Sequence, residues 1–173
     1  MKHESQYPQR KRVRITAWDY RQSGFYSITI CTNNRACSFG FIRDCKVELT
    51  ALGCLVQSTW LDLPNRNSNI SLDEFVVMPN HLHGILIITD GPPIHHDADI
   101  KRSFGKIQPH SISSMIRTFK ARVTRKAGRK VWQSGFHEHI IQNDEDLANH
   151  RAYIRNNPLQ WEHDRENPDF VGR

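Results

Sequence analysis

The hydrophobic positions along the chain alternate in some segments and recur at helical spacing in others. Four short segments are rich in β-branched and aromatic side chains, which is typical of strands. They span residues 24–32, 70–77, 81–88 and 136–142. Met78-Pro79-Asn80 separates the second segment from the third and has the composition of a tight turn. Residues 39–42 and 46–49 predict an additional small hairpin.

Three other segments carry apolar residues at helical spacing and predict helices. They cover about residues 52–63, 112–123 and 144–157. Thr50 and Ser111 are placed to cap the first two helices. Pro64 and Pro158 follow the first and the third, where a proline is typical of a helix end.

With the hairpin set aside, the predicted order is β-α-β-β-α-β followed by a helix. This order predicts an α+β, ferredoxin-like fold, in which an antiparallel sheet carries helices on one face. The length of 173 residues suits a single domain spanning 1–173. Within it we expect a basic N-terminal arm over about 1–20 and a short C-terminal extension over about 159–173. Such a fold does not select a function.

Composition narrows the class of protein. A hydrophobic fraction of 38% predicts a folded core. No apolar run approaches the roughly 18 residues of a membrane span, and the charged start lacks the apolar segment of a signal peptide. We therefore expect a cytoplasmic protein that does not bind membranes. Four cysteines without CxxC spacing favour free, mostly buried thiols, although two disulfides are possible on count alone.

Basic side chains are concentrated in two parts of a chain whose net charge is +6. Residues 101–130 contain lysines and arginines but no acidic residue, and the N-terminal arm is also basic. This segregation indicates a face that binds a polyanion, with a solvated basic helix as the alternative. The candidate phosphate contacts are Arg10, Lys11, Arg12, Arg14, Arg117, Lys120, Arg122, Arg125, Lys126, Arg129 and Lys130.

Two groups of residues could carry chemistry. His81 and His83 point to the same side of a strand, with Cα atoms roughly 7 Å apart, so their imidazoles could converge on one metal ion. In the last helix, Tyr153 lies off the apolar stripe and shares a face with Asn157, which we expect at the helix cap because Pro158 follows. An HxH pair such as His81 and His83 also occurs by chance, and a tyrosine among polar neighbours is often only a surface residue. His137 and His139 favour a structural or DNA-facing role.

Four sequence blocks together resemble the single-tyrosine HUH transposases, and most closely their REP-associated branch. The blocks are DEFVVMPNHLHGILI, FKARVTRKAG, VWQSGFHEHIIQN and YIRNNPLQW. The resemblance extends from about Arg12 to Pro168 with the blocks in the same order. MPNHLHG and YIxxNP are specific in combination, whereas either one alone would not be.

The resemblance implies a metal-dependent enzyme that cleaves and rejoins single-stranded DNA at repeat hairpins. It implies that Tyr153 is the nucleophile and forms a 5′-phosphotyrosine, and that His81, His83 and Asn157 hold Mg²⁺ or Mn²⁺. It further implies single-stranded or hairpin DNA as the partner. Monomer and homodimer both remain open, and the REP-associated branch favours the monomer.

Three rival functions remain. A domesticated protein could bind repeat hairpins without turnover, although intact candidate catalytic residues argue against it. An RNA-binding ferredoxin-like domain would carry paired aromatic residues on its central strands, where this sequence has histidines. A metallo-hydrolase that activates water would not need Tyr153.

Overall fold

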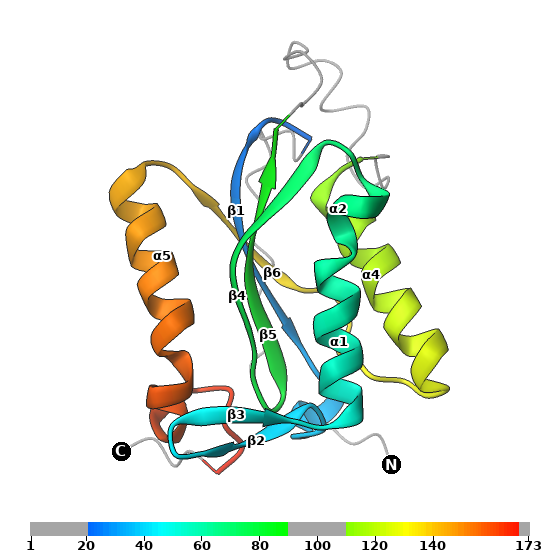
Figure 1. Ribbon diagram of the computed structural model, residues 1–173, viewed down its shortest axis with the longest axis vertical. Helices are drawn as coiled ribbons and strands as arrows, with labels where there is room; N and C mark the ends of the chain where they lie inside the picture. The colour runs from blue at the N-terminus through cyan, green and yellow to red at the C-terminus, as the bar shows by residue number, and fades with distance from the viewer. Residues whose placement is uncertain (1–20, 90–109, 170–173) are drawn as a thin grey trace, which may run out of the picture.

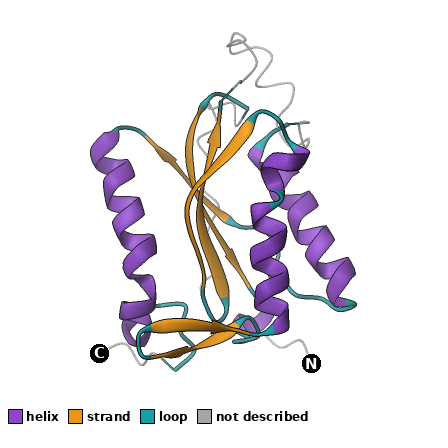
Figure 2. Cartoon of the chain, viewed as in Figure 1, coloured by secondary structure: helices purple, strands orange, loops and turns teal. Residues whose placement is uncertain are grey.

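The computed structural model describes residues 21–89 and 110–169 (Figure 1). Four strands form an antiparallel sheet in the order β4-β5-β1-β6. They are β1 (Gly24–Cys31), β4 (Ile70–Val77), β5 (His81–Ile88) and β6 (His137–Ile141). This order and the intervening helices confirm the predicted ferredoxin-like arrangement, whose strands and helices Figure 2 distinguishes by colour.

Polar side chains cap the main helices. Thr50, Ser111 and Asn143 each accept a hydrogen bond from a backbone N–H in the first turn of the helix that follows. The helical segments are α1 (Ala51–Leu61), α2 (Leu63–Arg66), α4 (Ile112–Ala127), α5 (Asp144–Asn156) and the 3₁₀ helices η1 (Asn33–Arg35) and η2 (Asn157–His163). We predicted that Pro64 follows the end of a helix, but this describes its position only in part. It lies in the first turn of α2, where a proline is tolerated.

The predicted hairpin forms a separate two-stranded sheet of β2 (Gly40–Arg43) and β3 (Lys46–Leu49). It lies at the end of the molecule where β4 turns into β5, close to η2 (Figure 1). The four-stranded sheet therefore has its β4–β5 turn, the hairpin and the residues that follow α5 gathered at one end.

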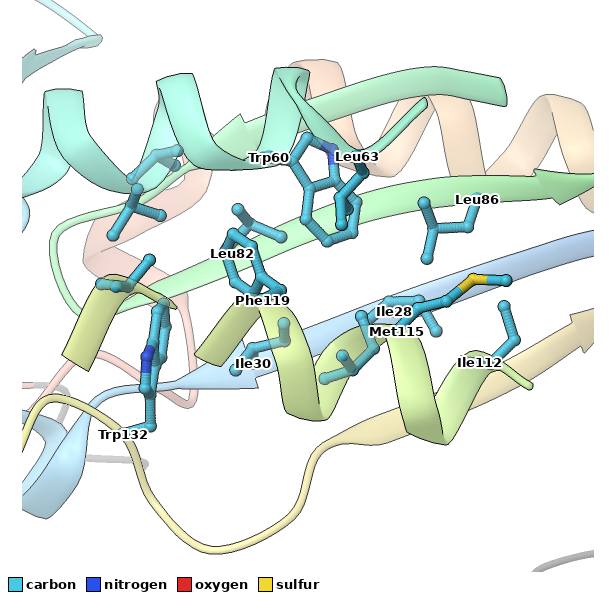
Figure 3. Close-up of a cluster of buried hydrophobic side chains, with 14 of the residues drawn as sticks. Ile28, Ile30, Trp60, Leu63, Leu82, Leu86, Ile112, Met115, Phe119 and Trp132 are labelled. Atoms are coloured by element: carbon cyan, nitrogen blue, oxygen red, sulfur yellow. The ribbon is translucent and has the colours of Figure 1, made fainter. Parts of the chain in front are cut away.

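Helices α1 and α4 cover one face of the sheet and form the main core with it. Ile28 and Leu82 are fully buried on this face (Figure 3). Trp60 of α1 and Phe119 of α4 meet edge to face, with ring centroids 5.4 Å apart. Burial of these large side chains supplies the main driving force for folding.

The C-terminal helix α5 packs on the opposite face of the sheet (Figure 1). Its Leu147 and Ile154 form a smaller buried cluster with Ile85 and Ile141. Both crossover helices thus share one face as predicted, and α5 adds a layer to the other. Side chains along a strand alternate between the two faces of the sheet. Because Leu82 belongs to the main core, His81 and His83 on either side of it lie on the face that α5 covers.

Replacing Gly84 by alanine should destabilise the protein. A Cβ atom at this position would lie 2.6 Å from Cζ2 of Trp60 and 3.1 Å from Cβ of Phe75. Because Trp60 is fully buried against Phe119, its ring has little room to move. We expect the free energy of unfolding to fall by about 1–3 kcal/mol in chemical denaturation. An unchanged denaturation midpoint would show that the ring can shift freely.

The cysteines agree with the prediction only in part. All four are free thiols, but only Cys31 is buried, and the other three are exposed. Burial, followed by the charge of Glu166, raises the pKa of Cys31 to about 12, so this thiol is not a reactive nucleophile. Among the helices of the described residues, none is both long and apolar enough to cross a membrane.

Candidate metal and nucleophile site

The two histidines of the HxH pair lie at the start of β5 with their side chains on the α5 face. Their rings meet edge to face, with centroids 4.5 Å apart. His81 is fully buried and His83 nearly so. Burial lowers the pKa of His81 to about 3 and the pKa of His83 well below its ordinary value. Both imidazoles are therefore neutral near pH 7, which is the form that binds a metal ion.

The hydrogen bonds of Asn80 determine which nitrogen of His81 carries the proton. The Asn80 amide nitrogen donates to the backbone carbonyls of Arg35 and Glu166, at 3.2 and 2.5 Å. Its Oδ1 therefore accepts, and it lies 2.8 Å from His81 Nδ1. Nδ1 of His81 must donate this bond, so Nε2 keeps a lone pair.

Thr29 on the neighbouring strand orients His83. Its hydroxyl lies 2.8 Å from His83 Nδ1. Nε2 of His83 lies 3.4 Å from the hydroxyl oxygen of Tyr153. The candidate nucleophile and the HxH pair, predicted from segments 70 residues apart, thus meet at one site.

Tyr153 reaches this site from α5 and remains 46% exposed. Burial of part of the ring and the negative charge of Asp164 raise the pKa of its phenol. Without a nearby positive charge the phenol is therefore protonated at neutral pH, and formation of the phenolate would need such a charge.

Two ion pairs hold α5 against β4 and so position Tyr153. Arg151 donates to Asp73, with Nε–Oδ1 and Nη2–Oδ2 distances of 3.0 and 2.5 Å. Arg155 lies 3.4 Å from Glu74. Asp73 and Glu74 lie inside β4 and anchor the helix that carries the tyrosine.

The Asp73–Arg151 pair predicts a pH-dependent stability. Hydrogen bonds from Arg151 are the main cause that lowers the pKa of Asp73 below its ordinary value of 3.8. Because the folded-state pKa is depressed, the stabilisation is present above pH 3.8 and is lost as the pH falls through the folded-state pKa. Asp73→Asn should lower the free energy of unfolding by about 1–2 kcal/mol at neutral pH.

Urea denaturation of the wild type and Asp73→Asn at neutral and at acidic pH tests this prediction. The difference between them should shrink as the pH falls. Glu74→Gln is the matched control and should cost less, because the Glu74–Arg155 pair is longer and more exposed. A difference between wild type and Asp73→Asn that is constant with pH would contradict the assignment.

Asn157 lies one helical turn after Tyr153 and closes the same site. It is the C-cap residue of α5, as predicted, and is 2% exposed. Among the described residues its Oδ1 makes no hydrogen bond of good geometry, although the Asn157 side chain lies close enough to His81 and Tyr153 to influence the pKa of both. Pro158 follows in the first turn of η2, so the chain turns at this residue toward the C-terminal segment.

Asp164, which sequence analysis did not single out, supplies a carboxylate to the site. Its Oδ2 lies 3.8 Å from His81 Nε2, and the ligand atoms of His81, His83 and Asp164 all lie within 4.8 Å of one another. Asp164 follows η2 in a segment without periodicity, so no local pattern indicates that it returns to the HxH pair. From the predicted C-terminal extension, Gln160 and residues 163–166 line the cleft at the site.

The site fits a divalent cation. Among the described residues, His81 Nε2, Asn157 Oδ1 and Asp164 Oδ2 are buried acceptors without hydrogen-bond partners. Leaving such atoms unsatisfied is costly, and a cation would satisfy them together. His83, Tyr153 and Asn157 also line a cleft of about 670 Å³, which His137 and Arg165 border. Solvent and a substrate can therefore reach Tyr153 from the side of this cleft.

No family model matches the chain. An uncharacterised protein of Haemophilus influenzae is 38% identical over 166 residues, which cover 90% of this chain and 91% of that protein. A second protein of that species, provisionally named a REP-associated tyrosine transposase, is 29% identical over 85 residues, covering 49% of this chain and 47% of that protein. The solved structure of a REP-associated tyrosine transposase bound to a REP hairpin has a TM-score of 0.59 and 22% identity, covering 89% of this chain and 73% of that chain.

The chain is similar to a REP-associated tyrosine transposase, in sequence over about half of its length and in fold over most of it. At 22% identity the solved structure supports the fold alone.

The predicted DNA contacts fall into three groups: residues outside the described part of the chain, residues with internal contacts, and exposed residues. The arm residues Arg10, Lys11, Arg12 and Arg14 lie outside the described residues. On α4, Lys120 donates to the carbonyls of Gln133 and Gly135 at 2.6 and 2.7 Å. Arg122 is mostly buried and lies 2.6 Å from Asp62. The structure thus shows internal contacts for Lys120 and Arg122, and we do not carry these two forward as DNA contacts.

The remaining basic residues of α4 and its exit are exposed: Arg117, Arg125, Lys126, Arg129 and Lys130. Arg117, Arg125 and Lys126 line a hollow of about 460 Å³ together with Arg66 of α2. Helix α4 covers the opposite face of the sheet from Tyr153. The structure therefore does not bring this basic surface together with the candidate site.

Proposed function

We propose that this chain cleaves and rejoins single-stranded DNA at repeat hairpins, with Tyr153 as the nucleophile. One observation carries the proposal. The Tyr153 hydroxyl lies 3.4 Å from His83 Nε2, at the open edge of a site in which three buried acceptors have no partner among the described residues. A tyrosine that acted only as a surface residue would not account for this convergence.

In the proposed step, the phenol oxygen of Tyr153 attacks the phosphorus of the scissile phosphodiester in line with the departing 3′-oxygen. The bond from phosphorus to the 3′-oxygen breaks as the bond to Tyr153 forms, leaving the 5′-phosphate on the tyrosine. The phenol proton passes to solvent, to which Tyr153 is partly exposed. The 3′-oxygen takes a proton from solvent and becomes a hydroxyl.

His81, His83 and Asn157 would hold a divalent cation, with the Asp164 carboxylate beside them. When bound, Mg²⁺ or Mn²⁺ would polarise the scissile phosphate and favour the phenolate. Asn80 and Thr29 fix the orientation of the two imidazoles before any ion binds. Because the ligand set contains imidazole nitrogens, we expect it to bind Mn²⁺ more tightly than Mg²⁺ and to bind Zn²⁺ or Ni²⁺ as well.

The phosphotyrosine would conserve the energy of the phosphodiester, so a 3′-hydroxyl could displace Tyr153 and rejoin strands without ATP. The solved relative is bound to a REP hairpin, which supports hairpin DNA as the substrate class. One chain supplies the tyrosine and all four candidate ligands. This arrangement supports a monomer as the active form.

The test uses hairpin DNAs with single-stranded flanks, labelled at the 5′ or the 3′ end and incubated with Mg²⁺ or Mn²⁺. Denaturing gels should show a protein adduct on the 3′-end-labelled fragment and a released fragment that keeps the 5′ label. Tight binding of several hairpins without cleavage by either ion would favour the domesticated binder. Cleavage without an adduct would favour a metallo-hydrolase that activates water.

A further inference from the structure

A second group of candidate ligands lies where β6 meets the start of α5. His139 extends from β6 with its side chain 50% exposed. Asp146 and His150 lie four residues apart on α5 and therefore share a face of the helix. The ligand atoms of these three residues all lie within 4.8 Å of one another. None of the three is a candidate ligand of the tyrosine site.

Both imidazoles direct Nε2 toward the same carboxylate. His139 Nε2 lies 2.9 Å from Asp146 Oδ2, and His150 Nε2 lies 3.5 Å from Asp146 Oδ1. The two rings are stacked, with centroids 4.7 Å apart and an interplanar angle of 25°. Ligands bound about 2.0–2.1 Å from a tetrahedral ion are about 3.4 Å apart, so small side-chain adjustments would bring all three onto one ion.

We propose that His139, Asp146 and His150 form a second metal site, which takes a late first-row transition ion such as Zn²⁺. Two imidazoles and one carboxylate favour such ions, whereas Mg²⁺ prefers a set of oxygen ligands. Three protein ligands leave a further coordination position for water on the exposed side of His139.

An ion bound here would join the edge strand of the sheet to the helix that carries the nucleophile. His150 lies three residues before Tyr153, and His139 is paired with Ser27 of β1 in the middle of β6. The site would therefore restrain the first turns of α5 relative to the sheet. Sequence analysis favoured a structural or DNA-facing role for His139. Its two partners, Asp146 and His150, come from a different element, which the alternation of the strand does not reveal.

The competing explanation is a helix cap without metal. Asp146 Oδ2 accepts a hydrogen bond from the backbone N–H of Gln142 at 3.1 Å, and His139 Nε2 lies 2.9 Å from the same oxygen. This explanation accounts for Asp146 and His139, but it does not require His150 to turn its Nε2 to the same carboxylate.

Calorimetric titration of the untagged full-length chain with Zn²⁺ at neutral pH tests the second site. The wild type should take up two ions, one at each site. His139→Gln and His150→Gln should each lose one ion, or bind it more weakly by at least the roughly 10- to 100-fold that loss of an outer-shell partner costs. Replacing His81 and His83 together should leave the second site intact.

His110→Gln is the matched control, since His110 is exposed and belongs to neither site. It should bind Zn²⁺ as the wild type does. Hydrogen exchange gives a second readout: Zn²⁺ should slow exchange over residues 137–150 in the wild type and in His110→Gln, but not in His150→Gln. The second site would be overturned if both His139→Gln and His150→Gln bound Zn²⁺ and were protected from hydrogen exchange as the wild type is. The three residues would then form a helix cap without metal. None of these readouts requires strand cleavage.

Discussion

Tyr153→Phe should abolish the covalent protein–DNA adduct and lower the rate of strand cleavage by roughly 10⁴-fold or more. The substitution removes only the hydroxyl that lies 3.4 Å from His83 Nε2. Because α5 stays fixed by the Asp73–Arg151 pair, binding of hairpin DNA should change little. Single-turnover cleavage of labelled hairpins and a binding titration on the same DNA measure the two effects separately.

Tyr26→Phe is the matched control. Tyr26 is buried on the opposite face of the sheet, and its hydroxyl donates to the backbone carbonyl of Gln22. Its replacement should leave cleavage within a few-fold of the wild type while lowering the free energy of unfolding by about 1 kcal/mol. Cleavage by Tyr153→Phe at the wild-type rate would assign the nucleophile to another group.

Replacing His81 or His83 by glutamine should remove metal-supported cleavage. Loss of one imidazole weakens the hold on the cation, which would contribute several kcal/mol of charge stabilisation to the transition state. The expected fall in cleavage rate is therefore roughly 10²- to 10⁴-fold at a limiting metal concentration. Excess Mn²⁺ should restore part of the rate, because the remaining ligands still converge on the site.

His110→Gln is again the control and should respond to metal as the wild type does. Melting curves without metal separate a folding defect from a binding defect. A folding defect would lower the melting temperature of the metal-free variant, whereas a binding defect would reduce only the rise that Mn²⁺ produces. Metal-independent cleavage by the wild type would contradict the role assigned to the HxH pair.

Most of the fold follows from local patterns. The spans 70–77 and 81–88 were predicted with the bounds the structure has, because apolar composition and a proline-containing turn define both ends. The caps at Thr50 and Ser111 were predictable for the same local reason. The position of Pro64 was not predictable, because a proline is tolerated both just after the end of a helix and in the first turn of the next helix.

The candidate site was predictable only where its residues lie in regular elements. Strand alternation brings His81 and His83 to one face, and helical spacing brings Asn157 near Tyr153. Asp164 depends on how the chain turns after η2, which no local pattern specifies. The internal partner of Arg122, Asp62, is 60 residues away in sequence, so a basic helix alone could not distinguish a structural arginine from a DNA contact.

The central claim is that Tyr153 becomes covalently joined to DNA, and peptide mapping of the adduct tests it most directly. The chain would be incubated with hairpin DNA and Mn²⁺, digested with nuclease and trypsin, and analysed by mass spectrometry. We expect a nucleotide linked through its 5′-phosphate to the peptide of residues 152–155, which contains Tyr153. A modified peptide from elsewhere in the chain, or cleaved DNA with no modified peptide, would contradict the account.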